Sequence, residues 1–341
     1  MYTNEDLNSA ITKGIFTEQS VNKFRSLVAE KNNLSAVDEE NFRLISGFND
    51  IFVVIACILL LASSAWVTNT IHPVFSIGVV AALSWGLAEF FVLKRRMALP
   101  AIVLLISFVG SVFALVIYAY ASYYENPFSF ASSSESAFML AASISTLAAW
   151  LHWKRFAIPI TIAAGMAAAA TFVISLLVYI MPSLKDFTMS LAFLAGVVTF
   201  GIAMIWDAAD RKRVTQKSDI AFWLHLLSAP LIVHPIFAGL GIFDDSQSSA
   251  SLVIIVVLYI VLSTISLAID RRAFMVSSLV YILYALTTLL KTYGLAGDSF
   301  AFAGVLIGFS LLVLSGFWHK ARYQLVHHLP PSIQQKIPFT S

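Results

Sequence analysis

Two histidines and two prolines stand in an apolar stretch, "HLLSAPLIVHP", at residues 225–235. His225 and His234 could bind a metal ion, relay protons along a solute path, or serve as hydrogen-bonded residues of a helix wall. Their spacing of nine residues puts them on nearly opposite faces of an α-helix, about 13.5 Å apart along its axis. Helical metal ligands are instead three or four residues apart. One straight helix therefore cannot bring both imidazoles onto one ion.

The two prolines in this stretch predict an irregular helix. Pro230 and Pro235 each lack the backbone N–H that an α-helix requires, so we expect the helix to be bent or broken between Ser228 and Pro235. In lipid, the carbonyl groups freed by such a bend must find partners in the protein or in water. Two interpretations stay open, a kinked structural helix with hydrogen-bonded histidines and a solute or proton path.

Glu89, in "WGLAEFF", is the one carboxylate that the sequence places clearly inside an apolar run. Carboxylates within a membrane are candidate functional groups. Glu89 precedes Lys94 by five residues, however, which is about 7.5 Å of helix. At that depth the carboxylate can also reach the interface or pair with a neighbouring cation.

Five other acids mark the ends of apolar runs, and we expect them to be structural: Asp50, Asp207, Asp210, Asp219 and Asp270. Asp50 suits a helix N-terminus, where a negative charge is stabilised. Asp207 and Arg211 have the spacing of an ordinary ion pair on a helix surface.

Long apolar runs must position these residues. The 341 residues are 59% hydrophobic and only 12% charged, whereas soluble domains carry about a quarter charged residues. Runs of about the ~20 residues that cross a bilayer as α-helix recur at 51–68, 73–93, 98–121, 136–153, 156–181, 187–206, 220–243, 250–269, 273–290 and 299–318. The sequence therefore predicts an all-α protein, a polytopic transmembrane bundle of about ten spans over residues 47–322.

A small helical module is predicted before the bundle, at residues 1–46. Gly14 suits the end of one helix and Thr17 the start of the next, with a third helix beginning near Ser35. The second helix carries an apolar stripe of Val21, Phe24, Leu27 and Val28. This face is too small for an independent core. We expect the module to dock on the bundle or on a protein partner.

The basic residues predict the orientation. Clusters of Lys and Arg follow every second span, and of the 21 such residues only Lys185 and Lys291 lie on the opposite side. By the positive-inside rule both termini are cytoplasmic, including a tail at residues 323–341, and an even number of spans agrees with this. We expect the cytoplasmic membrane of a bacterium.

Small residues predict how some spans meet. Gly304 and Gly308 form a GxxxG pattern, and Gly316 follows on a nearby face. Such patterns favour close approach of two helix backbones.

The stretch "LNSAITKGIFTEQSVNKFRSLV", together with the first three spans, resembles a family of bacterial membrane proteins catalogued as a domain of unknown function. Its members combine a short two-helix cytoplasmic module with many transmembrane helices. The matching positions are Gly14, Ile15, Thr17, Glu18 and Gln19 in the turn, Trp66, and the basic cluster at 94–96. A glutamine that the family carries near the end of the third span is missing from "VIYAYASYY". The resemblance implies a bacterial multi-pass membrane protein and no particular activity.

Several kinds of chemistry find no motif in the sequence. There is no phosphate-binding glycine loop, no HExxH and no recognisable catalytic triad. The single cysteine, Cys57, excludes an intrachain disulfide and a cysteine metal site. We therefore expect no metal, no cofactor and no nucleic acid; membrane lipids are the expected partners, and an intramembrane enzyme is the third-ranked class.

Two functions fit this pattern. One is a permease-like protein for a small or lipid-like solute, with its path near residues 225–235. The alternative is a non-transporting envelope scaffold or regulatory membrane protein, whose residues 1–46 recruit a partner.

Overall fold

The computed structural model describes residues 4–31, 48–123, 130–211, 213, 215–241, 249–292, 298–334 and 337–338. Every regular element in these ranges is a helix. Two short helices come first, α1 (Asn4–Thr12) and α2 (Glu18–Lys31). Ten long helices follow: α3 (Phe48–Asn69), α4 (Pro73–Ala88), α5 (Ala98–Tyr123), α6 (Phe130–Phe156), α7 (Ile160–Ile180), α8 (Thr188–Ala209), α9 (Gln216–Gly239), α10 (Ser249–Ile269), α11 (Ala273–Thr292) and α12 (Ser299–His327). The short elements are a π-helix η1 (Glu89–Lys94), a 3₁₀-helix η3 (Pro182–Phe187) and α13 (Pro331–Gln334).

The predicted all-α polytopic bundle is confirmed. Each of the ten predicted apolar runs coincides with one of the helices α3–α12. Within the described residues, eight helices are long and apolar enough to cross a membrane, and α10 contains a shorter apolar helix at Val253–Ile269. The protein is a multi-pass helical membrane protein.

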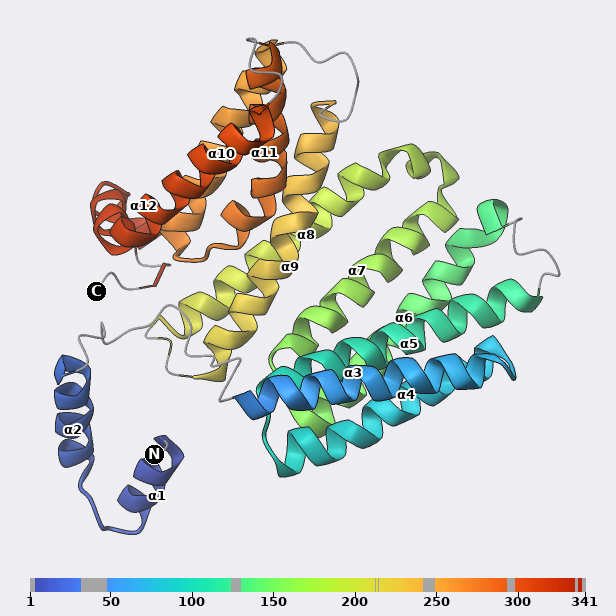
Figure 1. The fold of residues 1–341 in the computed structure, drawn as a ribbon, viewed down its shortest axis with the longest axis horizontal. Coiled ribbons are helices and arrows are strands. Elements are labelled where there is room, and N and C mark those ends of the chain that lie inside the picture. The colour runs from blue at the N-terminus through green and yellow to red at the C-terminus, as the bar shows by residue number, and fades with distance from the viewer. Residues whose placement is uncertain are drawn as a thin grey trace.

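Helix α2 begins as its sequence predicts. The Thr17 hydroxyl accepts a hydrogen bond from the amide of Ser20 at 3.2 Å, and the Ser20 hydroxyl accepts one from the amide of Thr17 at 3.0 Å. Gly14 ends the preceding turn with a φ of 70°. Figure 1 shows the α1–α2 hairpin apart from helices α3–α12. The predicted third helix and the side chains of Leu27 and Val28 lie outside the described residues, so docking of this module stays a prediction.

Consecutive long helices form antiparallel hairpins that bring four turns to one end of the bundle. In Figure 1, α3–α6 form one group, α7–α9 lie in the centre, and α10–α12 form the group at the opposite side. Each of the four turns contains a non-glycine residue in the left-handed region: Arg96, Ala157, Arg213 and Asp270. We call this end the basic end, because the clusters of Lys and Arg lie there.

Direct contacts join the turns of the basic end. The side chain of Gln216, after the α8–α9 turn, donates to the carbonyl of Ala157 in the α6–α7 turn at 2.6 Å. Arg213 in the α8–α9 turn donates to Asp270 in the α10–α11 turn at 2.8 Å. The α6–α7, α8–α9 and α10–α11 turns therefore meet at one end of the bundle.

Helix α9 is not broken at its prolines. It runs as α-helix from Gln216 to Gly239 with Pro230 and Pro235 inside it, so the predicted break is wrong, while the bend stays a prediction. Thr215 caps its start by accepting the amide of Lys217.

Gly196 on α8 marks the close approach of α8 to α9. A Cβ added at Gly196 would lie 2.8 Å from the Cβ of Leu231 and 2.9 Å from its carbonyl carbon. Leu231 is also the residue whose carbonyl Pro235 cannot bond. By contrast, a Cβ at Gly304, Gly308 or Gly316 would meet nothing within 4 Å among the described residues. Among the described residues, the GxxxG pattern therefore makes no close contact with a neighbouring helix.

We predict that Gly196→Ala destabilises the protein, because its methyl group would press on the backbone of α9. Overpacking of this kind costs about 1–3 kcal/mol. Gly201→Ala in the same helix is the control, since its Cβ meets nothing within 4 Å and alanine favours helix. Thermal unfolding in detergent should show a lower midpoint for Gly196→Ala and an unchanged or higher midpoint for Gly201→Ala. Equal midpoints for the two variants would show that α8 and α9 are not in close contact here.

Candidate functional site

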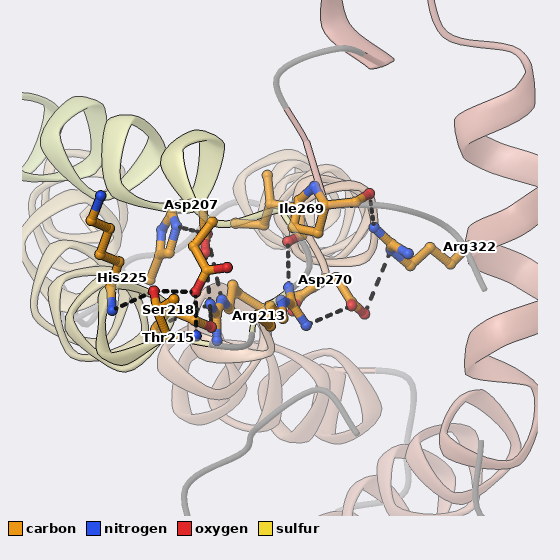
Figure 2. Close-up of polar contacts among 12 residues, drawn as sticks. Asp207, Arg213, Thr215, Ser218, His225, Ile269, Asp270 and Arg322 are labelled. Atoms are coloured by element: carbon orange, nitrogen blue, oxygen red, sulfur yellow. Dashed lines mark hydrogen bonds and ion pairs between the residues drawn. The ribbon is translucent and has the colours of Figure 1, made fainter. Parts of the chain in front are cut away.

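A buried carboxylate, Asp207, lies near the C-terminal end of α8 and is fully enclosed. Its Oδ1 accepts a hydrogen bond from Nη2 of Arg271 at 2.7 Å, and its Oδ2 lies 2.8 Å from Nε2 of His225 (Figure 2). Arg271 also donates to the carbonyl and the hydroxyl of Ser218, at 3.1 and 3.2 Å. Asp207 thus joins α8 to α9 and to the α10–α11 turn.

A second buried carboxylate, Asp270, lies beside the first in the α10–α11 turn. Its Oδ2 accepts from Nη1 of Arg213 at 2.8 Å, and its Oδ1 accepts from the indole N–H of Trp318 at 2.8 Å. Nε of Arg322 is 3.5 Å from the same Oδ1. Figure 2 shows Arg213 and Arg322 reaching Asp270 from different elements. Asp270 therefore connects the α8–α9 turn to helix α12.

We call these residues the buried network: Asp207, Arg213, Ser218, His225, Asp270, Arg271, Trp318 and Arg322. All eight are buried, and five of them carry a formal charge.

Tight turns hold the charged groups of the buried network in place. In the α8–α9 turn, Oδ2 of Asp210 accepts both the amide and the hydroxyl of Thr215, at 2.8 and 2.6 Å. In the α10–α11 turn, the amide of Arg271 donates a hydrogen bond to the carbonyl of Ser266, and the hydroxyl of Ser266 donates one to the carbonyl of Arg271. Arg213 and Asp270 adopt φ values of 53° and 58°, a conformation that costs energy in a residue with a Cβ. The surrounding bonds must stabilise it.

The C-terminal segment covers part of the network. Arg211 donates to the carbonyl groups of Gln334 and Ile337, each at 2.9 Å, and Arg322 donates to that of Pro338 at 2.8 Å. Ile337 is buried. Helix α12 itself continues to His327, so residues 323–327 of the predicted tail are helical.

Burial makes the charges of this network strongly interdependent. Taking an ionised group out of water costs several kcal/mol, which a partner of opposite charge must offset. The buried network supplies three guanidinium groups to two carboxylates, with the carboxylate of Asp210 close by. Burial, followed by the nearby charge of Arg271, lowers the pKa of Arg213 from its ordinary value, although Asp270 opposes this effect. Arginine nevertheless stays protonated in proteins.

The two histidines predicted as candidates bind different partners. His225 is fully buried against Asp207, and its Nδ1 has no hydrogen-bond partner among the described residues. Nδ1 of His234 lies 2.6 Å from the hydroxyl of Tyr281 on α11. Within the described part of the chain, no three His, Cys, Asp or Glu residues are placed to hold a metal ion. The histidines therefore point to different neighbours from one helix, as their spacing predicted.

Glu89 does not belong to the buried network. Its two carboxylate oxygens accept from Nε and Nη2 of Arg155 at 2.8 and 2.7 Å, forming a bidentate ion pair between η1 and α6. The side chains of Glu89 and Arg155 are 34% and 54% exposed. Pairing with a neighbouring cation is one of the interpretations of Glu89 that the sequence allowed.

The sequence did not identify Asp207, Asp270, Arg213, Arg271 and Arg322 as a site. The expected surface pair of Asp207 with Arg211 is wrong, because Asp207 bonds Arg271 and His225 while Arg211 bonds the C-terminal segment. One signal was present. The dipeptide Asp-Arg recurs at 210–211 and 270–271, at the ends of two alternate spans.

The fold and the buried network define a multi-pass helical membrane protein with an enclosed ionic cluster at its basic end. Comparisons of the chain with family models, with curated proteins and with solved structures found no match.

We predict that Asp207→Asn destabilises the protein far more than Glu89→Gln. Removing one partner of a buried ion pair leaves an uncompensated charge and costs about 3–5 kcal/mol. An exposed pair such as Glu89–Arg155 contributes little, so Glu89→Gln should leave stability unchanged within error. Unfolding titrated with a denaturing detergent measures both variants. Equal losses of stability would mean that Asp207 is not held as a buried charge.

Proposed function

We propose that the protein is a permease-like membrane protein for a small or lipid-like solute. The buried network is its closed gate at the basic end, between helices α8–α9 and helices α10–α12. The observation that carries this proposal is the burial of five charged side chains, Asp207, Arg213, Asp270, Arg271 and Arg322, between these helices.

Buried charges favour a gate over a purely structural joint. An ion pair inside a protein is often no more stabilising than apolar packing of the same volume. Ionisable residues within membrane helices mark substrate paths and coupling sites by default. Charged hydrogen bonds are also discrete contacts that break and re-form between two arrangements, as switching interfaces require.

Helix α9 is the wall of the proposed path. His225 faces α8 through Asp207, and His234 faces α11 through Tyr281. In this proposal, the arrangement in which His225 is fully buried is the closed state of the gate. Opening would separate Arg271 from Asp207 and admit water to His225. By the positive-inside rule this end is the cytoplasmic face of a bacterial membrane.

A second function has its own supporting observation. The α1–α2 hairpin stands apart from the bundle (Figure 1), and Ile15 and Phe16 in its turn are 66% and 49% exposed. Exposed apolar groups of this kind suit the recruitment of a protein partner. This observation supports a scaffold or regulatory protein.

Reaction with a water-borne thiol reagent tests the gate. Cys57→Ala removes the one natural cysteine, and Ser228→Cys or Ser278→Cys then reports on two buried positions on α9 and α11. Both positions lie one or two helical turns beyond the network. We predict slow reaction of each cysteine with a charged methanethiosulfonate in membrane vesicles. Adding Arg271→Gln should accelerate the reaction about tenfold, which corresponds to ~1.4 kcal/mol of lost gate closure.

Arg155→Gln is the matched control, because it removes an arginine from the same end without touching the buried network. It should leave both reaction rates unchanged. If neither cysteine reacts faster in a correctly folded Arg271→Gln variant, the gate proposal fails and the scaffold alternative gains. In that case deletion of residues 1–46 should abolish the recruitment of the protein partner, while the bundle stays folded.

A further inference from the structure

A groove runs along the outside of the bundle between α11 and α12. Its volume is about 480 Å³, within the ~300–1,000 Å³ of ligand sites. It is lined by Arg272 in the turn before α11, by Met275, Val276 and Leu279 on α11, and by Gly308, Leu311, Leu312, Ser315 and Trp318 on α12. Most of the lining is apolar, and the one charged residue is Arg272.

The charged residue lies at one end of the groove. Arg272 is exposed in the turn before α11, and its guanidinium carbon is 4.9 Å from the ring centroid of Trp318. Leu279 is seven residues further along α11, about 10 Å deeper, and Gly308 is ten residues from Trp318, about 15 Å deeper. The groove thus has a cationic mouth at the basic end and an apolar floor that extends toward the middle of the apolar span.

Small residues on α12 make the floor. A Cβ at Gly308 would meet nothing within 4 Å among the described residues, and Ser315 is exposed. The neighbouring side chains of Leu312 and Val276 are 75% and 57% exposed. A face shaped in this way is complementary to a flexible apolar chain that lies along the helices.

From this geometry we propose that the groove is a binding site for one anionic membrane lipid. The phosphate of the lipid is held by the Arg272 guanidinium and one acyl chain lies between α11 and α12. Guanidinium groups recognise phosphate oxygens through paired hydrogen bonds. A basic group where membrane helices meet the headgroup region is typical of sites for anionic lipids.

A second copy of the chain is the competing occupant, because GxxxG faces also pair helices. The cationic mouth favours the lipid. Pairing of two copies through this face would bring the Arg272 side chains of both toward one another, whereas a phosphate attracts a guanidinium group.

The lipid site is connected to the buried network through one side chain. Trp318 lines the groove, carries Arg272 over its ring, and donates its indole N–H to Asp270 at 2.8 Å. A lipid bound here contacts the residue that fixes Asp270. The site nevertheless stands independently of the proposed gate, since it rests on the shape and charge of the groove.

Native mass spectrometry of the full chain tests the site. The protein is released from detergent after exposure to equal amounts of phosphatidylglycerol and phosphatidylcholine with the same acyl chains. We expect one tightly retained phosphatidylglycerol per chain. Arg272→Gln should reduce this preference roughly fivefold, the value of one cation at a membrane surface, while Arg272→Lys should retain most of it. Ser315→Phe, which fills the groove, should reduce retention of both lipids.

Lys154→Gln is the matched control. Lys154 also lies over a tryptophan, with its Nζ 4.6 Å from the ring centroid of Trp150, but it borders no part of this groove. The Lys154→Gln variant should retain both lipids as the unaltered protein does. Equal retention of the two lipids by the unaltered protein, or an equal effect of Lys154→Gln and Arg272→Gln, would overturn the site. Loss of a dimer in Ser315→Phe without loss of lipid would assign the groove to a second copy.

Discussion

The ionised carboxylate of Asp207 in a fully enclosed position is the constraint on which the rest of the basic end depends. A buried carboxylate must find cations and donors inside the protein, because the cost of its desolvation is several kcal/mol. Arg271 and His225 supply them from two different elements. Meeting this requirement fixes where the α10–α11 turn lies relative to α8 and α9. The position of Asp270, the neighbour of Arg271 in the chain, follows from it.

The tight turns translate this local requirement into the arrangement of whole helices. Arg213 and Asp270 both occupy the left-handed region of backbone space, which few non-glycine residues adopt without support. Their side chains bond each other across two turns. Trp318 and Arg322 on α12 both contact the carboxylate of Asp270. Two hairpins and helix α12 are joined by polar contacts at one end, where a small rearrangement of a few charges would change how the helices pack.

The sequence predicted the helices well and the site poorly, for physical reasons. Span positions depend on local hydrophobicity, so all ten long helices coincide with apolar runs, and the Thr17 cap formed as expected. The partners of Asp207 are 18 and 64 residues away along the chain, and no local pattern indicates them. Helical spacing favoured Arg211 as its partner, but that side chain is turned to the C-terminal carbonyls. The GxxxG pattern of α12 likewise predicted a neighbouring helix, whereas the described bundle leaves that face open.

If the buried network holds α9 and α12 together, the distance between these two helices at the basic end depends on the network. Spin labels at Lys217→Cys and Lys320→Cys, both exposed positions, in a Cys57→Ala background allow this distance to be measured by pulsed electron resonance in lipid nanodiscs. We predict one narrow distance distribution for the protein without this change, and a second population at longer distance when Asp207→Asn is added. A distribution that stays narrow and unshifted in a folded Asp207→Asn protein would contradict this prediction, since the network would then not determine the packing of these helices.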